Sequence, residues 1–450
     1  MVAGADRYNV PTFPDVLWLL HGFFRCTMTA NRTTTVAAAV LLFLAPATML
    51  TLRGGTGYCF FLLLAVALVN LAVMRGQRGY LEPLRKYPLY TASMLAFTLY
   101  LPLQQLLEHY YLPRQFDAMS RLVLSLPIFL LFCTVSSRSL ALVGWGCATG
   151  AVGAGAWAFI SGINASWGDL NRLGNYYTNP IPFGNTALLL GFLAVLSIRW
   201  DSGLARRFSI PVKLFALLAG GYASYLSGTR GGWLALPLFA WLVAANFGWM
   251  RHRVRLAVVG AVLVVGVAAL FSTHVVQQRL RDTASDLHQL EHGNADTSIG
   301  LRLQLWNASS HLFLQHPVLG VGKGKLERSL QTLANNHEAS QAIVNERAHS
   351  EFFSTIAELG TFGVACLLLL YWGPLAYFLR HYRSADATVS TAAYCGIAVS
   401  GSAIIFGLSI DVLSSVMNVA LIALLWATMM AIIHRGTRAE AAPARPQAAV

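Results

Sequence analysis

The chain has 450 residues, of which 56% are hydrophobic and only 11% are charged, and its mean hydropathy is +0.55. Soluble domains carry about 25% charged residues, so this composition excludes an ordinary soluble domain and indicates an integral membrane protein. The formal net charge of +13 would suggest nucleic acid in a soluble protein. In a membrane protein the meaning of the net charge depends on which loops carry Lys and Arg. No nucleic-acid partner is expected.

Apolar windows of spanning length, roughly 17–25 residues, recur along the whole chain. They lie near 35–52, 57–74, 88–107, 120–135, 139–162, 183–199, 211–228, 232–249, 255–272, 351–379, 390–410 and 412–433. We therefore expect an all-α integral membrane protein of about twelve transmembrane helices, with membrane lipids around it. Ala45-Pro46-Ala47 resembles a signal-peptidase site, but a long polar lead precedes this apolar segment, so an uncleaved first span is favoured.

Two further features of the apolar part bear on packing and on metal binding. Gly146, Gly150, Gly153 and Gly155 give the fifth window a small-residue face, which is typical of closely packed membrane helices. The six cysteines are scattered singly, without CxxC pairs or ligand spacing. Neither a disulfide framework nor a zinc site is indicated.

Lys and Arg are distributed unevenly between the connectors. If both termini are cytoplasmic, twenty of them fall in cytoplasmic segments and five in the short outer connectors. Short cytoplasmic loops carry the excess of Lys and Arg, so this orientation is favoured. It places the long polar interruption near 273–350 outside the cytoplasm.

That interruption contains seven acidic and seven basic residues, and it reads as a folded helical subdomain between spans nine and ten. Helices are predicted near 275–292, over 299–315 with Pro317 as its stop, and after Gly324. Leu301, Leu305 and Leu312 form an apolar stripe at helical spacing. The expected organisation is a membrane bundle over 1–272, the outer loop over 273–350, spans ten to twelve over 351–434 and a cytoplasmic tail over 435–450.

Three motifs gather on the outer side. The first is Ser227-Gly228-Thr229-Arg230-Gly231-Gly232, between two adjacent spans. The second begins at Arg302, four residues before Trp306, and continues to His316-Pro317-Val318-Leu319-Gly320-Val321-Gly322. The third is Ala348-His349-Ser350-Glu351, which leads into Ala357-Glu358-Leu359-Gly360-Thr361-Phe362-Gly363.

These motifs resemble the signature of the O-antigen ligase and O-antigen polymerase superfamily. Ser350 stands where many members carry Asn. The resemblance implies a GT-C-like membrane glycosyltransferase that takes a glycan from undecaprenyl diphosphate at the periplasmic face of the bacterial inner membrane. An O-antigen ligase, which transfers the polysaccharide to a lipid A–core sugar, is the preferred interpretation. O-antigen polymerase and protein O-oligosaccharyltransferase use the same donor and remain alternatives.

The implied roles suit the chemistry of these side chains. Attack of a sugar hydroxyl on an anomeric carbon needs a proton acceptor with a pKa near neutrality, which favours His349 as general base. Arginine matches phosphate oxygens with two parallel hydrogen bonds, so Arg230 and Arg302 are expected to hold the diphosphate leaving group. Arg172 and Lys323 are lesser candidates for donor contacts. The expected reaction is an inverting displacement without metal, ATP or another cofactor.

Less specific interpretations stand beside these. A histidine at a loop–helix junction is usually an interfacial polar residue, Arg230 could extend to the headgroups, and Arg302 could form a helix ion pair within the loop. His288 and His292 have the spacing of a metal pair, but the HExxH order and a third ligand are absent from the sequence, which favours a solvated helix face. A twelve-span transporter is the alternative from another class, although the spans are poor in ionisable midplane residues.

Overall fold

The computed structural model describes residues 27–74, 76, 79–162, 172–252, 254, 260, 277, 281, 285, 286, 288, 289, 292, 297–344 and 346–441. Within these residues the regular structure is helical, apart from one isolated antiparallel bridge between Asn175 and Thr178. The expected all-α class is therefore confirmed. Most of the predicted span at 255–272 and most of the predicted helix at 275–292 lie outside the described residues.

The helices that agree with the apolar windows are α2 (Thr27–Ala47), α3 (Gly55–Met74), α5 (Pro88–Leu107), α6 (Phe116–Thr134), α8 (Val143–Ser161), α9 (Pro180–Leu196), α10 (Gly203–Leu226), α12 (Leu236–Asn246), α17 (Glu351–His381), α18 (Ala387–Gly407) and α19 (Val416–Ala441). Two more, α15 (Ser298–Gln315) and α16 (Leu326–Asn335), lie in the polar interruption. Short helical turns connect them, among them α4 (Glu82–Lys86), η1 (Pro113–Gln115), α7 (Ser137–Leu140), α11 (Arg230–Trp233), η6 (Gln341–Ile343) and η7 (Val412–Ser414).

Eight segments of the described chain are long and apolar enough to cross a membrane: 55–74, 113–134, 137–161, 180–200, 203–226, 351–381, 387–407 and 416–438. A helix of 20 residues such as α3 is about 30 Å long, which matches the hydrocarbon core. The window at 232–249 is divided between the short helices α11 and α12. A multi-pass membrane protein is shown, and the count of about twelve spans stays a prediction.

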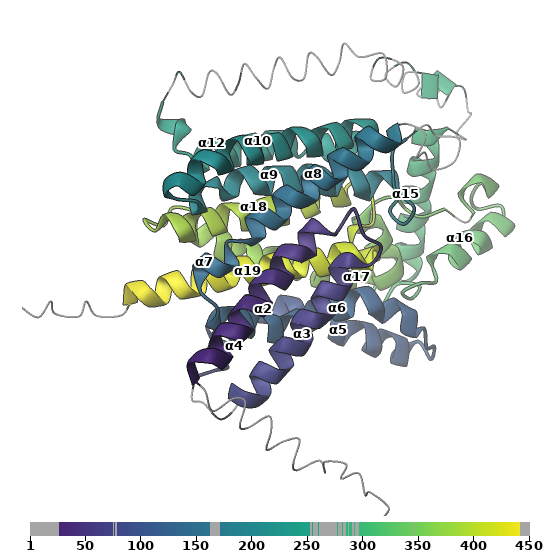
Figure 1. Cartoon of the computed structure of the whole chain (residues 1–450). Helices are drawn as coiled ribbons and strands as arrows, with labels where there is room; N and C mark the ends of the chain where they lie inside the picture. The colour runs from purple at the N-terminus through teal and green to yellow at the C-terminus, as the bar shows by residue number, and fades with distance from the viewer. Residues whose placement is uncertain are drawn as a thin grey trace, which may run out of the picture.

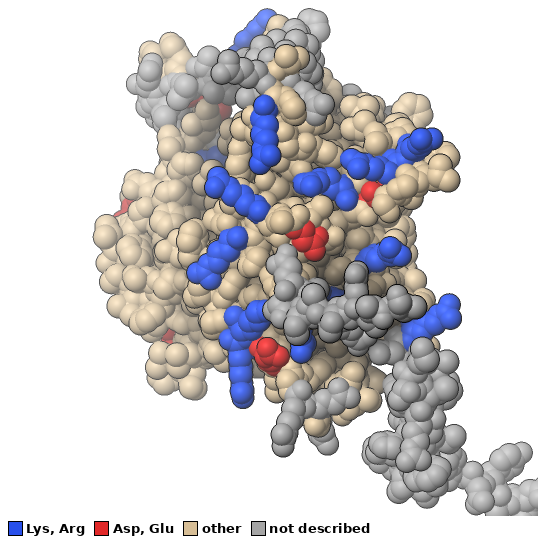
Figure 2. Space-filling view, turned by 90° about the vertical axis from the view of Figure 1, so that its left-hand side faces the viewer, with Lys and Arg blue, Asp and Glu red and all other residues tan. Residues whose placement is uncertain are grey.

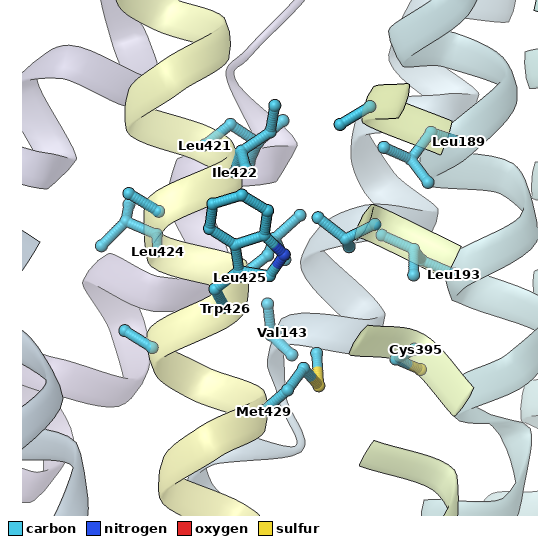
Figure 3. Packing of buried hydrophobic residues seen from close by; sticks show 14 of the residues in the cluster. Val143, Leu189, Leu193, Cys395, Leu421, Ile422, Leu424, Leu425, Trp426 and Met429 are labelled. Atoms are coloured by element: carbon cyan, nitrogen blue, oxygen red, sulfur yellow. The ribbon is translucent and has the colours of Figure 1, made fainter. Parts of the chain in front are cut away.

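The core lies between α9, α18 and α19, which are buried along most of their length. Trp426 of α19 is fully buried, and its indole N–H donates to Ser400 Oγ of α18 at 2.9 Å. Figure 3 shows this ring on the side of α19 that faces Leu193 of α9 and Cys395 of α18. By contrast, α3 and α10 are mostly exposed and apolar, as expected of helices that face lipid.

The small-residue face predicted on α8 is confirmed. A Cβ at Gly146 would lie 2.2 Å from the Phe43 carbonyl oxygen, and one at Gly150 would lie 2.2 Å from that of Pro46. These two glycines let the backbone of α2 approach α8 closely. Gly155 lets α10 approach α8 closely, since a Cβ at Gly155 would lie 2.6 Å from the Cβ of Ala219.

The helices α15 and α16 form an outer unit at one end of the bundle, where α17 begins (Figure 1). A separate small core holds this unit together and contains Leu305, Leu312, Leu330, Leu333 and Ile343. Leu305 and Leu312 of the predicted stripe are thus buried inside the unit, and Leu301 is partly buried against it. The helices of 298–315 and 326–335 agree closely with the expectation from Pro317 and Gly324.

Figure 2 looks at the opposite end of the bundle, where Lys and Arg clearly outnumber Asp and Glu. The exposed basic residues at the helix ends on this side include Arg138, Arg206, Arg251 and Arg380. The described part of the chain therefore has two chemically distinct ends. One carries the basic helix ends, and the other carries the α15–α16 unit and the predicted site residues.

Candidate functional site

His349 lies immediately before α17, in a backbone conformation that few residues other than glycine adopt. Its φ is +50°, in the left-handed region that is uncommon for residues with a side chain. Ala348 on its N-terminal side is fully buried, and Ser350 on its other side is also buried. The His349 side chain is 36% exposed, and its Nε2 lies 3.3 Å from Glu346 Oε2. The imidazole is thus accessible and has a carboxylate neighbour.

Trp306 of α15 fixes the backbone at this point. Its indole N–H donates to the Ala348 carbonyl at 3.0 Å, and its ring stacks on Phe353 of α17 with centroids 4.9 Å apart. Arg302 lies four residues earlier on the same face of α15. It is half-buried. Helical spacing therefore puts Arg302 on the face of α15 that contacts the Ala348 backbone through Trp306. The alternative of an ion pair within the loop stays open, because Asp282, Glu291 and Asp296 of the loop lie outside the described residues.

Arg172 and Arg230 come together at the turn between α10 and α11. Gly228 in this turn has a φ of +63°, and the Arg172 guanidinium donates to the carbonyls of Ser227 at 2.9 Å and Gly228 at 3.2 Å. Arg230 follows as the exposed first residue of α11. Arg172 thus supports the turn that presents Arg230.

The segment between α18 and α19 joins these two regions. Gly231, beside Arg230, is so close to this segment that a Cβ would lie 2.4 Å from Ser409 Oγ. Two residues further on, Asp411 Oδ1 accepts from Ser354 Oγ of α17 at 2.8 Å. The first turns of α17 and the turn carrying Arg230 therefore pack on one connection, at the same end of the bundle as His349.

A kink in α17 accounts for the glycines of the second and third motifs, Gly320 and Gly360. Gly360 has φ +61° and ψ −158°, which interrupts the helix and frees backbone groups on both sides. The segment after α15 satisfies them: Val321 N–H donates to the Ala357 carbonyl at 2.8 Å, and Thr361 N–H donates to the Pro317 carbonyl at 2.9 Å. Gly320 is required by this approach, because a Cβ would lie 2.4 Å from the Glu358 carbonyl carbon.

Glu358 holds the same segment through its side chain. Its Oε2 accepts from Lys323 Nζ at 2.5 Å, and its Oε1 accepts from Gly324 N–H at 3.0 Å. Burial by itself would lower the pKa of Lys323, but the carboxylates of Glu358, Glu351 and Asp411 raise it overall. The ammonium group of Lys323, a candidate donor contact from the sequence, is thus already paired with a carboxylate.

A polar cavity of about 530 Å³ opens beside these groups. It lies between η1, the start of α6, the 323–327 segment, the first turns of α17 and η7. Its lining comprises Arg114, Gln115, Asp117, Ala118, Met119, Lys323, Gly324, Leu326, Glu327, Glu346, Arg347, Ser354, Glu358, Asp411, Leu413, Ser414 and Val416. The Glu346 carboxylate that contacts His349 belongs to this wall.

Asp411 is a site residue that the sequence interpretation passed over. Burial raises the pKa of its carboxyl, against the hydrogen bond from Ser354 and the charge of Lys323, which lower it. Its only signal in the sequence is its place directly after an apolar run. Glu346, three residues before His349, could have been found from that spacing.

Among the described residues, no group of three His, Cys, Asp or Glu side chains is arranged to hold a metal ion. The rings of His288 and His292 stack with centroids 4.2 Å apart, and Gln289 between them bonds Ser285. The pair lies in a part of the chain described only at single positions.

Comparisons with known proteins agree with the motifs. Residues 214–368 match the family described as O-Antigen ligase. An uncharacterized protein of Haemophilus influenzae is 21% identical over 295 residues, which is 63% of this chain and 71% of that protein. The O-antigen ligase of Escherichia coli is 23% identical over 198 residues, which is 43% of this chain and 46% of that protein. The resemblance to the O-antigen ligase superfamily is confirmed, and the matched region includes Arg230, Arg302 and His349.

Proposed function

We propose that the protein is an O-antigen ligase, which moves a polysaccharide from undecaprenyl diphosphate to a lipid A–core sugar. The observation that carries this proposal is the accessible His349 with its Glu346 neighbour at the edge of a polar cavity. The family match over 214–368 supports the reaction class. A transporter has no use for a histidine held in this way outside the bundle core.

In the proposed reaction, His349 acts as general base. Its imidazole takes the proton from the attacking acceptor hydroxyl while the new bond forms between that oxygen and the anomeric carbon of the donor. The bond from the anomeric carbon to the diphosphate oxygen breaks from the opposite face, so the configuration inverts. Glu346 stabilises the imidazolium that forms, because its carboxylate lies 3.3 Å from Nε2.

Arg230 and Arg302 take the leaving group in this proposal. The diphosphate gains negative charge as the bond breaks, and guanidinium groups stabilise it through paired hydrogen bonds. Arg172 contributes by holding the turn that presents Arg230. Lys323 contributes by fixing the segment after α15, through Glu358. The donor diphosphate supplies the driving force, so neither ATP nor a cofactor is part of the scheme.

The proposed location is the bacterial inner membrane, with both termini in the cytoplasm and the site facing the periplasm. The basic helix ends seen in Figure 2 support this orientation, since cytoplasmic segments carry the excess of Lys and Arg. A cysteine placed at exposed Thr332 should react with a membrane-impermeant maleimide in spheroplasts, and one at exposed Arg206 should not. The reverse labelling pattern would refute the orientation.

The test of function uses purified protein, a glycan-charged undecaprenyl diphosphate and lipid A–core. His349→Ala should lower transfer about 10²- to 10⁴-fold, as expected for loss of a general base. His337→Ala is the matched control, because His337 is also a histidine with positive φ in the outer unit, at +60°. Near-normal transfer by a well-folded His349→Ala protein would refute the assignment. Elongation on the carrier instead of transfer to lipid A–core would make the protein a polymerase.

A further inference from the structure

We propose that the polar cavity of about 530 Å³ is the subsite for the sugar end of the acceptor, an inference that rests on the proposed function. Its volume falls within the range of ligand pockets, roughly 300–1,000 Å³. It is far larger than one water molecule requires, about 30 Å³. The occupant we assign is a hydroxyl-rich saccharide that belongs to the acceptor, not the lipid diphosphate of the donor.

The charges on the wall separate the two substrates. Five carboxylates and three basic side chains line the cavity. Lys323 is paired with Glu358, and Arg121 pairs with Asp117, which leaves Glu327, Glu346 and Asp411 beside Arg114 and Arg347. The wall therefore offers no excess of positive charge to a diphosphate, which carries at least two negative charges. Neither Arg230 nor Arg302, the proposed diphosphate ligands, is part of the wall.

The same wall suits sugar hydroxyls. Carboxylates such as Asp117 and Glu327 accept hydrogen bonds from hydroxyl groups, while guanidinium groups such as Arg114 donate to hydroxyl oxygens. Half-buried Val416 adds apolar surface on which the face of a sugar ring can pack. Such a mixture of a few directed polar groups and apolar surface is typical of sites that fix the orientation of a ligand.

The cavity also has the position that an acceptor requires. Glu346 lines it and contacts His349, so a hydroxyl at this edge of the cavity lies on the side of the base. Another part of the wall is fixed by hydrogen bonds: Leu413 N–H donates to Glu351 Oε2 at 2.8 Å, and Ser354 donates to Asp411 at 2.8 Å. A rigid wall near the base would orient one hydroxyl for attack.

Ser414 offers a direct probe of occupancy. It is exposed, lines the cavity, and donates its hydroxyl to the Asp411 carbonyl. Thr332 on α16 is a matched control, because it is also exposed, bonds the Arg328 carbonyl and lies outside the cavity. We would label S414C and T332C with a polar maleimide in nanodiscs. The parent protein, whose described cysteines are buried or half-buried, provides the background rate.

Lipid A–core without O-antigen should slow labelling of S414C at least about fivefold and leave T332C unchanged. Lipid A that lacks the core sugars, and undecaprenyl-diphosphate glycan, should leave both rates unchanged. The protection should persist in a His349→Ala background, because it reports binding and not transfer. Protection of S414C by the donor, or its absence with lipid A–core, would overturn the proposal.

A kinetic measurement gives a second readout. Ser414→Trp places a large side chain in the cavity and should raise the KM for lipid A–core at least about tenfold with the donor KM unchanged. Thr332→Trp should change neither. A rise in donor KM alone would overturn the assignment. If the parent protein binds lipid A–core at this cavity yet transfers no glycan to it, the proposed function fails while the acceptor subsite stands.

Discussion

We expect the Lys323–Glu358 ion pair to contribute measurably to the free energy of unfolding, because it holds the segment after α15 on α17. The two side chains are only 16% and 10% exposed, and Nζ and Oε2 are 2.5 Å apart. At an effective dielectric constant of about 20, the gross attraction at that distance is about 7 kcal/mol, much of it offset by the cost of burying both charges. Removing one partner of a buried pair costs about 3–5 kcal/mol, because the other charge is left without compensation. Since both groups retain some exposure, we expect about 3 kcal/mol for Glu358→Gln.

Glutamine is the informative substitution because it keeps the shape and an acceptor oxygen for the Gly324 N–H. The loss of stability in Glu358→Gln then reports the removed charge and not a change in packing. Lys323→Met should cost a similar amount, and the double variant should be less destabilised than the sum of the two single variants by about 2 kcal/mol. Unfolding of the purified variants by SDS in mixed micelles, followed by tryptophan fluorescence, measures these differences.

The pair also has a defined pH dependence. Its carboxylate neighbours raise the pKa of Lys323, so its contribution is fully present below the ordinary lysine pKa of about 10.4 and is lost only as the pH rises through the raised value. The difference between the parent protein and Lys323→Met should therefore not decrease between about pH 6 and pH 9. A Glu358→Gln variant within about 0.5 kcal/mol of the parent, the range of ordinary surface substitutions, would refute the reasoning.

Three further substitutions test the surroundings of the base. Glu346→Gln should lower transfer about fivefold, in line with about 1 kcal/mol for a half-exposed ion pair, and an unchanged rate would show that the carboxylate does not assist His349. Trp306→Phe keeps the ring but leaves the buried Ala348 carbonyl without its donor, at a cost of about 1–3 kcal/mol in SDS unfolding. Gly320→Ala should lower the thermal unfolding temperature strongly, because its φ is +71° and its Cβ would meet backbone. Parent-like stability of that variant would argue against the close approach to α17.

The sequence predicts the elements of this fold well, because each depends on local information. The apolar windows agree with the long helices, and Pro317 and Gly324 bound α15 and α16 as expected. The small-residue face of α8 follows from its glycine spacing. Helical period and chain breakers are sufficient for such features.

The parts that could not be predicted depend on contacts between distant segments. A glycine in an apolar helix does not reveal that Gly360 has a positive φ, or that a segment forty residues earlier satisfies the freed backbone. The sequence marks Lys323 as a cation near the outer face, but its partner on α17 is visible only in three dimensions. For the same reason the cavity was missed, since its wall combines Asp117, Glu346 and Asp411 from separate parts of the chain.

The arrangement around α17 explains why a base placed at a loop–helix junction can be held firmly. The first three turns of this helix are fixed at three points: Phe353 by the stacked ring of α15, Ser354 by Asp411, and Glu358 by the segment after α15. His349 precedes these anchors by only a few residues, so they also restrict the motion of its backbone. A base that is held in place before substrate binds loses little conformational entropy on reaching the transition state. Two long substrates must still enter. Any opening that admits them therefore has to come from segments that pack on α17, because movement of α17 itself would break all three anchors at once.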